Sequence, residues 1–126
     1  MLKITYLEEE IYLEHLSKPI ETWKAERVLV SLRAGISTYV ETGLASLVFP
    51  IDAYCLEGLV KLAEKELLDI APCDEEFIEV ALLGTWIAQS KDSELGIFVC
   101  ELGQENEEFL YRLWLESTVG TSVISE

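Results

Sequence analysis

Apolar and polar positions alternate at the start of this chain, as they do in a strand pair with one buried face. Residues 3–7 and 11–16 carry this alternation, and Glu8-Glu9-Glu10 supplies a polar turn between them. The pattern predicts an antiparallel hairpin. It does not decide which face of the second strand points to the core.

The spacing then changes to that of a helix. Pro19 suits a first helical turn and Gly35 suits a helix end, which predicts a helix over 19–33. A strand over 27–33 is the alternative, since this stretch contains the β-branched residues Val28 and Val30. The helical face expected to point to the core consists of Ala25, Val28, Leu29 and Leu32.

A second unit repeats this order. Residues 36–41 and 44–49 flank Thr42-Gly43, which is typical of a two-residue hairpin in which glycine supplies a positive φ. Pro50-Ile51-Asp52-Ala53-Tyr54 then repeats Pro19-Ile20-Glu21-Thr22-Trp23, so we expect Asp52 to cap a second helix over 53–68. Gly58, inside this helix, indicates close packing against a neighbouring element, most simply the sheet.

A third, more diverged unit follows a loop expected at 69–76. Strands are predicted at 77–88 and 95–102, joined by a polar turn at 89–94. The apolar run 97–100 favours burial on both faces and therefore a central place in the sheet. A last helix is predicted over 106–116, and residues 117–126 are expected to form a flexible tail.

Together these elements predict one α+β domain over residues 1–116. We expect a mainly antiparallel sheet of about six strands with three helices on one face, built as a (ββα)3 repeat of units 1–35, 36–76 and 77–116. The uncovered face or edge of such a sheet needs protection, and self-association is one way to provide it.

Composition narrows the classes of partner. The 126 residues include 24 Asp and Glu against 9 Lys and Arg, which gives a net charge of −15. This charge, without a local basic cluster, disfavours nucleic acid and anionic membranes as partners. No stretch is long and apolar enough to span a bilayer, and the first residues do not resemble a secretory leader. The odd number of cysteines favours a reduced, cytoplasmic setting.

Candidate chemistry is sparse. Cys55, Cys73 and Cys100 lack metal-ligand spacing, and the acidic runs lack the pattern of a calcium loop, so we predict no metal and no cofactor. His15 is the single histidine, and no nucleophile motif accompanies it. The sequence therefore predicts no catalytic residue.

Aromatic residues are the better candidates for an interaction surface, because tryptophan and tyrosine often anchor interfaces. Packing between helices and sheet would explain the tryptophans equally simply. The candidate interaction residues are Trp86, Tyr12, Trp23 and His15, with Trp86 placed toward the tip of the third hairpin.

The stretches 84–88, 96–102 and 109–114 resemble those of uncharacterised small acidic proteins of cyanobacteria. The resemblance covers most of the chain and carries no catalytic residue with it. The hypothesis we favour is a non-enzymatic protein-interaction module, a regulator, adaptor or assembly factor that binds another protein or itself as a homodimer. The alternatives are a small-ligand sensor with a Trp-lined pocket and a small hydrolase or isomerase that uses paired carboxylates.

Overall fold

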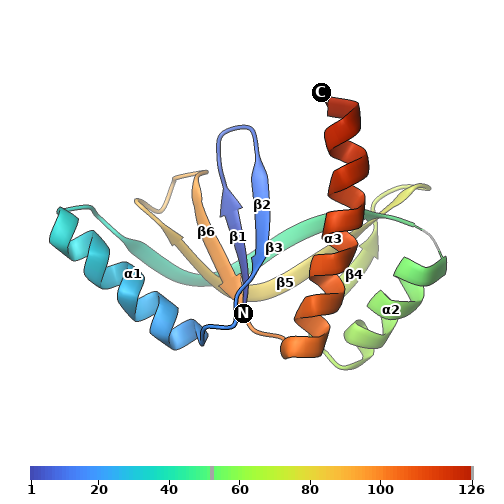
Figure 1. Cartoon of the computed structure of the whole chain (residues 1–126), viewed down its shortest axis with the longest axis horizontal. Helices are drawn as coiled ribbons and strands as arrows, with labels where there is room; N and C mark the ends of the chain where they lie inside the picture. Colours follow the sequence, from blue (N-terminus) through green and yellow to red (C-terminus); the bar gives the residue numbers. More distant parts are fainter. Residues whose placement is uncertain (52, 126) are drawn as a thin grey trace.

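The computed structural model describes residues 1–51 and 53–125, with the side chains of 53–55 and 118–125 excepted. It confirms an α+β fold with three helices and a mainly antiparallel six-stranded sheet (Figure 1). The elements are, in chain order, β1 (Leu2–Tyr6), β2 (Ile11–His15), α1 (Ile20–Ala34), β3 (Tyr39–Pro50), α2 (Ala53–Glu64), β4 (Asp69–Pro72), β5 (Phe77–Ala88), β6 (Gly96–Cys100) and α3 (Gln104–Ser125).

The first and third hairpins form as predicted. β1 pairs with β2 in the register Ile4 to Leu13, and β5 pairs with β6 in the register Trp86 to Phe98. The two hairpins join where β1 pairs with β6, which gives the strand order β2-β1-β6-β5-β3. β6 therefore lies inside the sheet, and residues 97–100 are buried on both of its faces, as the apolar run predicted.

The predicted second hairpin is wrong, and with it the (ββα)3 repeat. Residues 39–50 form one continuous strand, β3, which pairs antiparallel with β5 along its whole length. Gly43 lies opposite Gly84 in this ladder and does not adopt a positive φ. The pairing with β5 provides many more backbone hydrogen bonds than a local turn at Thr42-Gly43 would, which explains the difference.

The sixth strand lies where the sequence indicated a loop. β4 pairs with the first part of β5, on the edge that β6 occupies farther along the strand. The stretch 69–72 is short, and Pro72 limits it to an edge position, so its pattern alone did not distinguish it from a loop.

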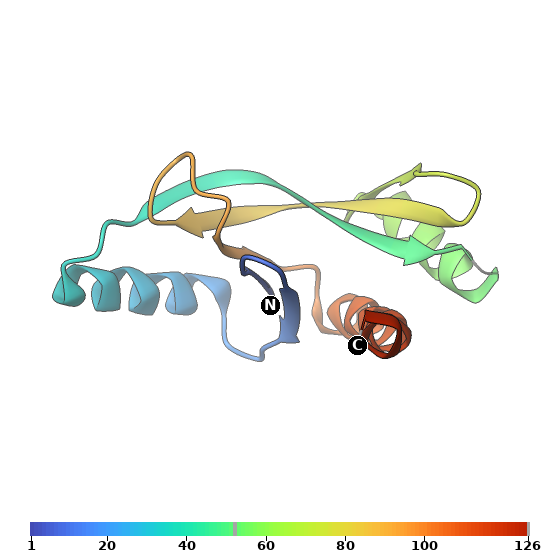
Figure 2. The same ribbon diagram turned by 90° about the horizontal axis from the view of Figure 1, so that it is seen from above.

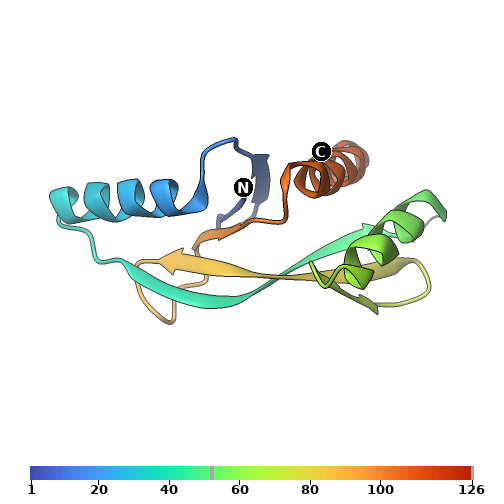
Figure 3. The same ribbon diagram turned by 90° about the horizontal axis from the view of Figure 1, so that it is seen from below.

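The prediction that all three helices cover one face is also wrong. α2 and α3 pack on the main core, to which the alternate residues Leu2, Ile4 and Phe98 contribute. Trp23 of α1 instead packs with Ile97 and Val99, which point to the opposite face of β6. Figure 3 shows the β1–β2 hairpin lying between α1 and α3. The sheet is therefore covered on both sides, in different places.

Residues 27–33 are helical, so the alternative strand is excluded, and Gly35 ends α1 with a φ of 71° as expected. The face of the helix that was predicted to point to the core is, however, largely exposed to solvent. Ala25 and Leu29 are exposed, and Leu32 is 71% exposed, whereas Ser31 is buried. α1 carries apolar residues on two sides, and the contact of Trp23 with β6 selects the side without Leu29 and Leu32.

The other two helices differ from prediction mainly in length. α2 ends at Glu64 rather than near 68, and Glu66 follows with a φ of 62°. Asp52, the expected cap of α2, lies outside the described residues. α3 extends to Ser125, beyond the predicted end at 116, and the flexibility of the segment 117–126 stays a prediction. Among the described helices, none is both long and apolar enough to cross a membrane.

Candidate functional site

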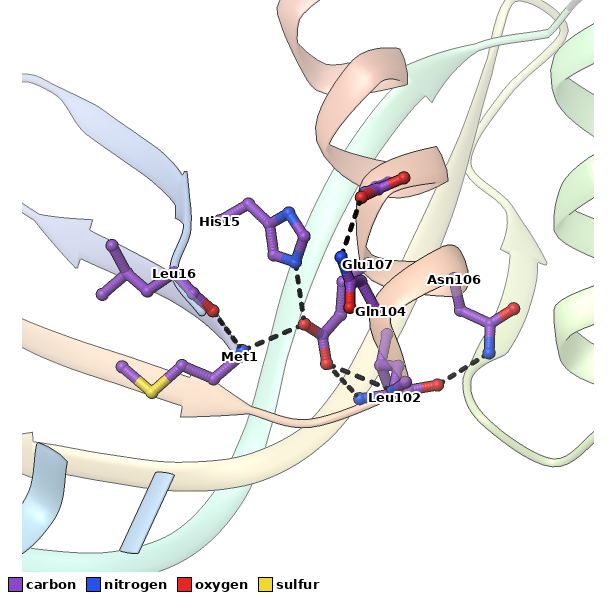
Figure 4. Close-up of polar contacts among 9 residues, drawn as sticks. Met1, His15, Leu16, Leu102, Gln104, Asn106 and Glu107 are labelled. Carbon is purple, nitrogen blue, oxygen red and sulfur yellow. Dashed lines mark hydrogen bonds and ion pairs between the residues drawn. The ribbon is translucent and has the colours of Figure 1, made fainter. Parts of the chain in front are cut away.

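Glu107 is the most deeply buried charged side chain of the described core, with only 3% of its surface exposed. Its Oε1 atom lies 3.0 Å from the amino group of Met1 and 3.0 Å from Nε2 of His15. Its Oε2 atom accepts hydrogen bonds from the backbone N–H groups of Leu102, at 2.9 Å, and Gly103, at 3.2 Å. Figure 4 shows how these groups surround the carboxylate.

The start of α3 places Glu107 in this position. Gly103 adopts a φ of 92° just before the helix, which turns the backbone N–H groups of Leu102 and Gly103 toward the side chain. Asn106 also donates from Nδ2 to the Leu102 carbonyl at 2.7 Å. A carboxylate in the first helical turn is further favoured by the helix dipole.

The electrostatics of this cluster favour a charged carboxylate. Burial by itself would raise the pKa of Glu107, but the hydrogen bond from the Leu102 backbone and the nearby amino group of Met1 outweigh it. The pKa therefore lies below its ordinary value. The amino group of Met1 also donates to the Leu16 carbonyl at 2.7 Å, so the cluster connects the chain start, β2 and α3.

A histidine beside a carboxylate is a pair that general acid–base catalysis can use. Here, however, the second oxygen of Glu107 is held by two backbone groups and the first is shared with the amino group of Met1. The tilted ring of Tyr111 lies 6.4 Å from the ring of His15. This arrangement suits a buried electrostatic contact that joins elements of the fold.

The other three candidate interaction residues lie apart from one another. The ring of Trp86 packs edge-on against Tyr6 at 5.1 Å, next to the main core. Trp23 lies on the opposite side of the sheet, with the Lys3 ammonium 5.7 Å from its ring centre. Tyr12 is exposed on β2, and its hydroxyl donates to Glu10. Their role in binding stays a prediction.

The sequence did not single out an apolar surface that the structure exposes on β3 and β5. We call it the open face: the residues of β3 between 40 and 48 and of β5 between 77 and 85 that point away from the main core. Leu44 and Leu83 are direct cross-strand partners there, 68% and 64% exposed. The open face consists of Val40, Thr42, Leu44, Ser46 and Val48 of β3 with Phe77, Glu79, Ala81, Leu83 and Thr85 of β5.

A signal for the open face was present in the sequence. β3 is apolar on both of its faces, since Val40, Leu44 and Val48 alternate with the buried Ala45 and Leu47. Such a strand is expected to be covered on both sides. Figure 2 shows β3 and β5 side by side as a long twisted ribbon. Around Leu44 and Leu83 the side away from the main core is exposed, whereas Ile87, near the end of β5, is buried on that same side.

Cysteines and acidic residues form no further site in the described part of the chain. Cys100 is buried and Cys73 is exposed, and both are free thiols. The side chain of Cys55 lies outside the described residues. Among the residues described, no group of three or more His, Cys, Asp or Glu side chains could hold a metal ion.

Comparison with known proteins places the chain in a family. It belongs to the Alr0857-like family, whose model matches residues 1–118. Alr0857 is a cyanobacterial gene name, in agreement with the resemblance to cyanobacterial proteins. No curated protein and no solved structure matches the chain.

Proposed function

We propose that this chain is a non-enzymatic protein-interaction module that binds through the open face and the free edge of β3. The observation that carries the proposal is the exposed cross-strand pair of Leu44 and Leu83. Large aliphatic side chains that lie opposite each other and are exposed to water mark a surface whose burial by a partner is favourable.

The edge of β3 supports the same proposal. β3 pairs with β5 on one side only and is the last strand of the sheet order, so its outer backbone groups have no strand partner among the described residues. Natural edge strands are usually protected by lysine, an interior proline or a bulge. β3 has none of these between residues 39 and 49, and Glu41 is its single charged residue. Such an edge suits the addition of another strand.

We propose a second copy of the chain as the partner, which makes the module a homodimer. Antiparallel pairing of two identical β3 strands would place the two Glu41 side chains toward opposite ends of the contact. The apolar side chains between them would then meet. The net charge of −15 on each copy opposes this association through long-range repulsion, which salt screens beyond about 8 Å at physiological ionic strength.

Sedimentation velocity at low micromolar concentration tests this proposal. The wild-type chain should form a dimer that tightens as salt is added. The double substitution Leu44→Ser and Leu83→Ser should weaken the dimer by about a hundredfold or more, because each buried leucine contributes about 1.5–3 kcal/mol. Leu115→Ser, which removes an exposed leucine of α3, is the matched control and should leave association unchanged.

Two results would contradict the homodimer. If the chain is a monomer at all salt concentrations, it does not form the proposed dimer. If a dimer forms but the double substitution leaves it unchanged, the dimer contact lies outside the open face. Binding of a basic protein whose on-rate falls with salt would support the module but with a different partner.

A cytoplasmic location is part of the same proposal. Its support is the exposed free thiol of Cys73 and the absence of a disulfide among the described cysteines. Cell fractionation of the native host tests it.

A further inference from the structure

A cavity of about 350 Å³ lies between α1 and the sheet. Its walls come from α1, the ends of β1, β5 and β6, the link at 36–38 and the turn at 89–95. Figure 2 shows α1 running beside this end of the β3–β5 ribbon. Trp23 packs the first turns of α1 against the sheet, whereas the following turns border the cavity. The volume is at the lower end of the range found for small-molecule sites.

The floor of the cavity is apolar. Ile87 and Ile97 are cross-strand partners in the register of β5 with β6, and both are buried. Val30 of α1 and Ile36, both partly open to solvent, also line the cavity. Ile87, Ile97 and Val30 lie on a strand or helix, whereas Ile36 lies in the link after α1. Together these side chains are suited to hold a small apolar group.

The polar side of the cavity differs from the rest of the molecule. In a chain with 24 acidic residues, no Asp or Glu is among the residues that line it, and Arg27 is the single charged one. Two lysines of this helix region are paired, Lys18 with Glu26 at 2.7 Å and Lys24 with Glu21 at 3.0 Å, whereas Arg33, which does not line the cavity, has no ion pair with a described residue. Arg27 makes no ion pair with any described residue.

Ser31 provides an independent observation. It follows Arg27 by one helical turn, and both residues line the cavity, Arg27 at its exposed rim and Ser31 in its buried part. Ser31 is only 8% exposed and lines the cavity, yet its hydroxyl makes no hydrogen bond to another described residue. No buried side-chain nitrogen or oxygen of the described residues lacks a hydrogen-bond partner, so the Ser31 hydroxyl is accessible from the cavity and can donate to a ligand there.

We propose that this cavity binds a small apolar monocarboxylate. The carboxylate accepts hydrogen bonds from the guanidinium of Arg27 and the hydroxyl of Ser31, and the apolar body lies on Ile87 and Ile97. An arginine fork matches the geometry of a carboxylate. A phosphate dianion fits less well, because Arg27 offers one positive charge in a chain of net charge −15. The proposal is independent of the proposed homodimer.

Octanoate is a suitable probe. In amide chemical-shift titrations of the labelled full chain, octanoate should shift Ile97, Ile87 and Ser31 and saturate at low millimolar concentration or below. The titration is repeated on the Leu44→Ser and Leu83→Ser variant, so that a probe bound on the open face is recognised. Octan-1-ol, which has the same chain length without the charge, should bind at least tenfold more weakly.

Substitutions separate the anchor from the rest of the helix. Arg27→Gln should weaken octanoate binding about tenfold or more and leave octanol binding unchanged. Arg33→Gln is the matched control, since Arg33 is an exposed arginine of the same helix that does not line the cavity. Ser31→Ala should weaken octanoate binding by a smaller factor, because it removes a neutral donor.

Three results would overturn the proposal: no shifts at the cavity residues, equal binding of octanol and octanoate, or equal losses in the Arg27→Gln and Arg33→Gln variants. Each variant is first checked for the wild-type amide spectrum outside α1. This check distinguishes loss of binding from loss of the fold.

Discussion

The ring of Phe109 lies directly against Gly58, so that a Cβ atom added to Gly58 would meet the ring at 2.1 Å. The close packing that the sequence predicted at Gly58 is therefore confirmed, but its partner is α3 rather than the sheet. A glycine inside a helix costs about 1 kcal/mol relative to alanine. Because Gly58 has no side chain, the Phe109 ring of α3 can pack directly against α2 at this position.

We predict that Gly58→Ala destabilises the chain by about 1–2 kcal/mol, because displacing the ring costs more than the gain in helix propensity. In a Phe109→Ala background the same substitution should stabilise it by up to about 1 kcal/mol. Urea unfolding of the wild type, Gly58→Ala, Phe109→Ala and the double variant measures the change in the free energy of unfolding in each background. If Gly58→Ala has the same effect in both backgrounds, the two residues do not interact.

The carboxylate of Glu107 should be important for stability at neutral pH. Glu107→Gln leaves the amino group of Met1 buried without its negative partner, which should cost about 3 kcal/mol. Glu108→Gln is the matched control, since Glu108 is exposed on the next residue of α3 and should change stability little. Urea unfolding at pH 7 checks both.

The pH dependence follows from the lowered pKa of Glu107. A carboxyl group whose pKa is lower in the folded state stabilises the fold above its ordinary value of 4.5 and loses this contribution as pH falls through the folded-state pKa. The difference between wild type and Glu107→Gln should therefore decrease below pH 4.5. A difference that stays constant down to pH 2 would contradict the ionic origin.

Glycine substitutions in the β3–β5 ladder test the corrected strand. A side chain added at Gly43 meets no atom within 4 Å, and Gly43 has no positive φ. Gly43→Thr should then stabilise the chain by up to about 1 kcal/mol, as a strand former replaces glycine. In a two-residue hairpin the same change would destabilise. Thermal unfolding reports the sign.

Gly84, the cross-strand partner of Gly43, should respond in the opposite way. A Cβ at Gly84 would lie 2.3 Å from the Val99 carbonyl oxygen, a backbone atom of β6 that cannot move freely. Gly84→Ala should therefore destabilise by about 2 kcal/mol or more. A neutral effect in thermal unfolding would show that β6 does not pass so close to β5.

The thiols should differ in reactivity. Burial, with a further contribution from Glu107, raises the pKa of Cys100 to about 12, so almost none of it is thiolate at pH 8. In a Cys55→Ala background, a disulfide reagent should modify Cys73 rapidly and Cys100 only as fast as the fold opens. Rapid modification of two thiols in the native protein would contradict the burial of Cys100.

Local patterns determined the parts of this fold whose partners are close in sequence. The turn at Glu8-Glu9-Glu10 and the polar turn at 89–94 each join strands that pair with each other, so alternation and turn chemistry were sufficient to predict them. The helix over 20–34 likewise follows from its spacing and from Gly35, which is a local stop signal.

Tertiary structure decided the features that depend on distant partners. Thr42-Gly43 is compatible with a turn or with the middle of a strand, and only the full-length pairing with β5 selects the strand. α1 is apolar on two sides, and only the contact with β6 determines that Leu32 faces solvent while Arg27 and Ser31 border a cavity. His15 was recognisable in the sequence, but Glu107, its partner, lies 92 residues away. Periodicity reports which positions share a face, whereas burial depends on which other segment covers that face.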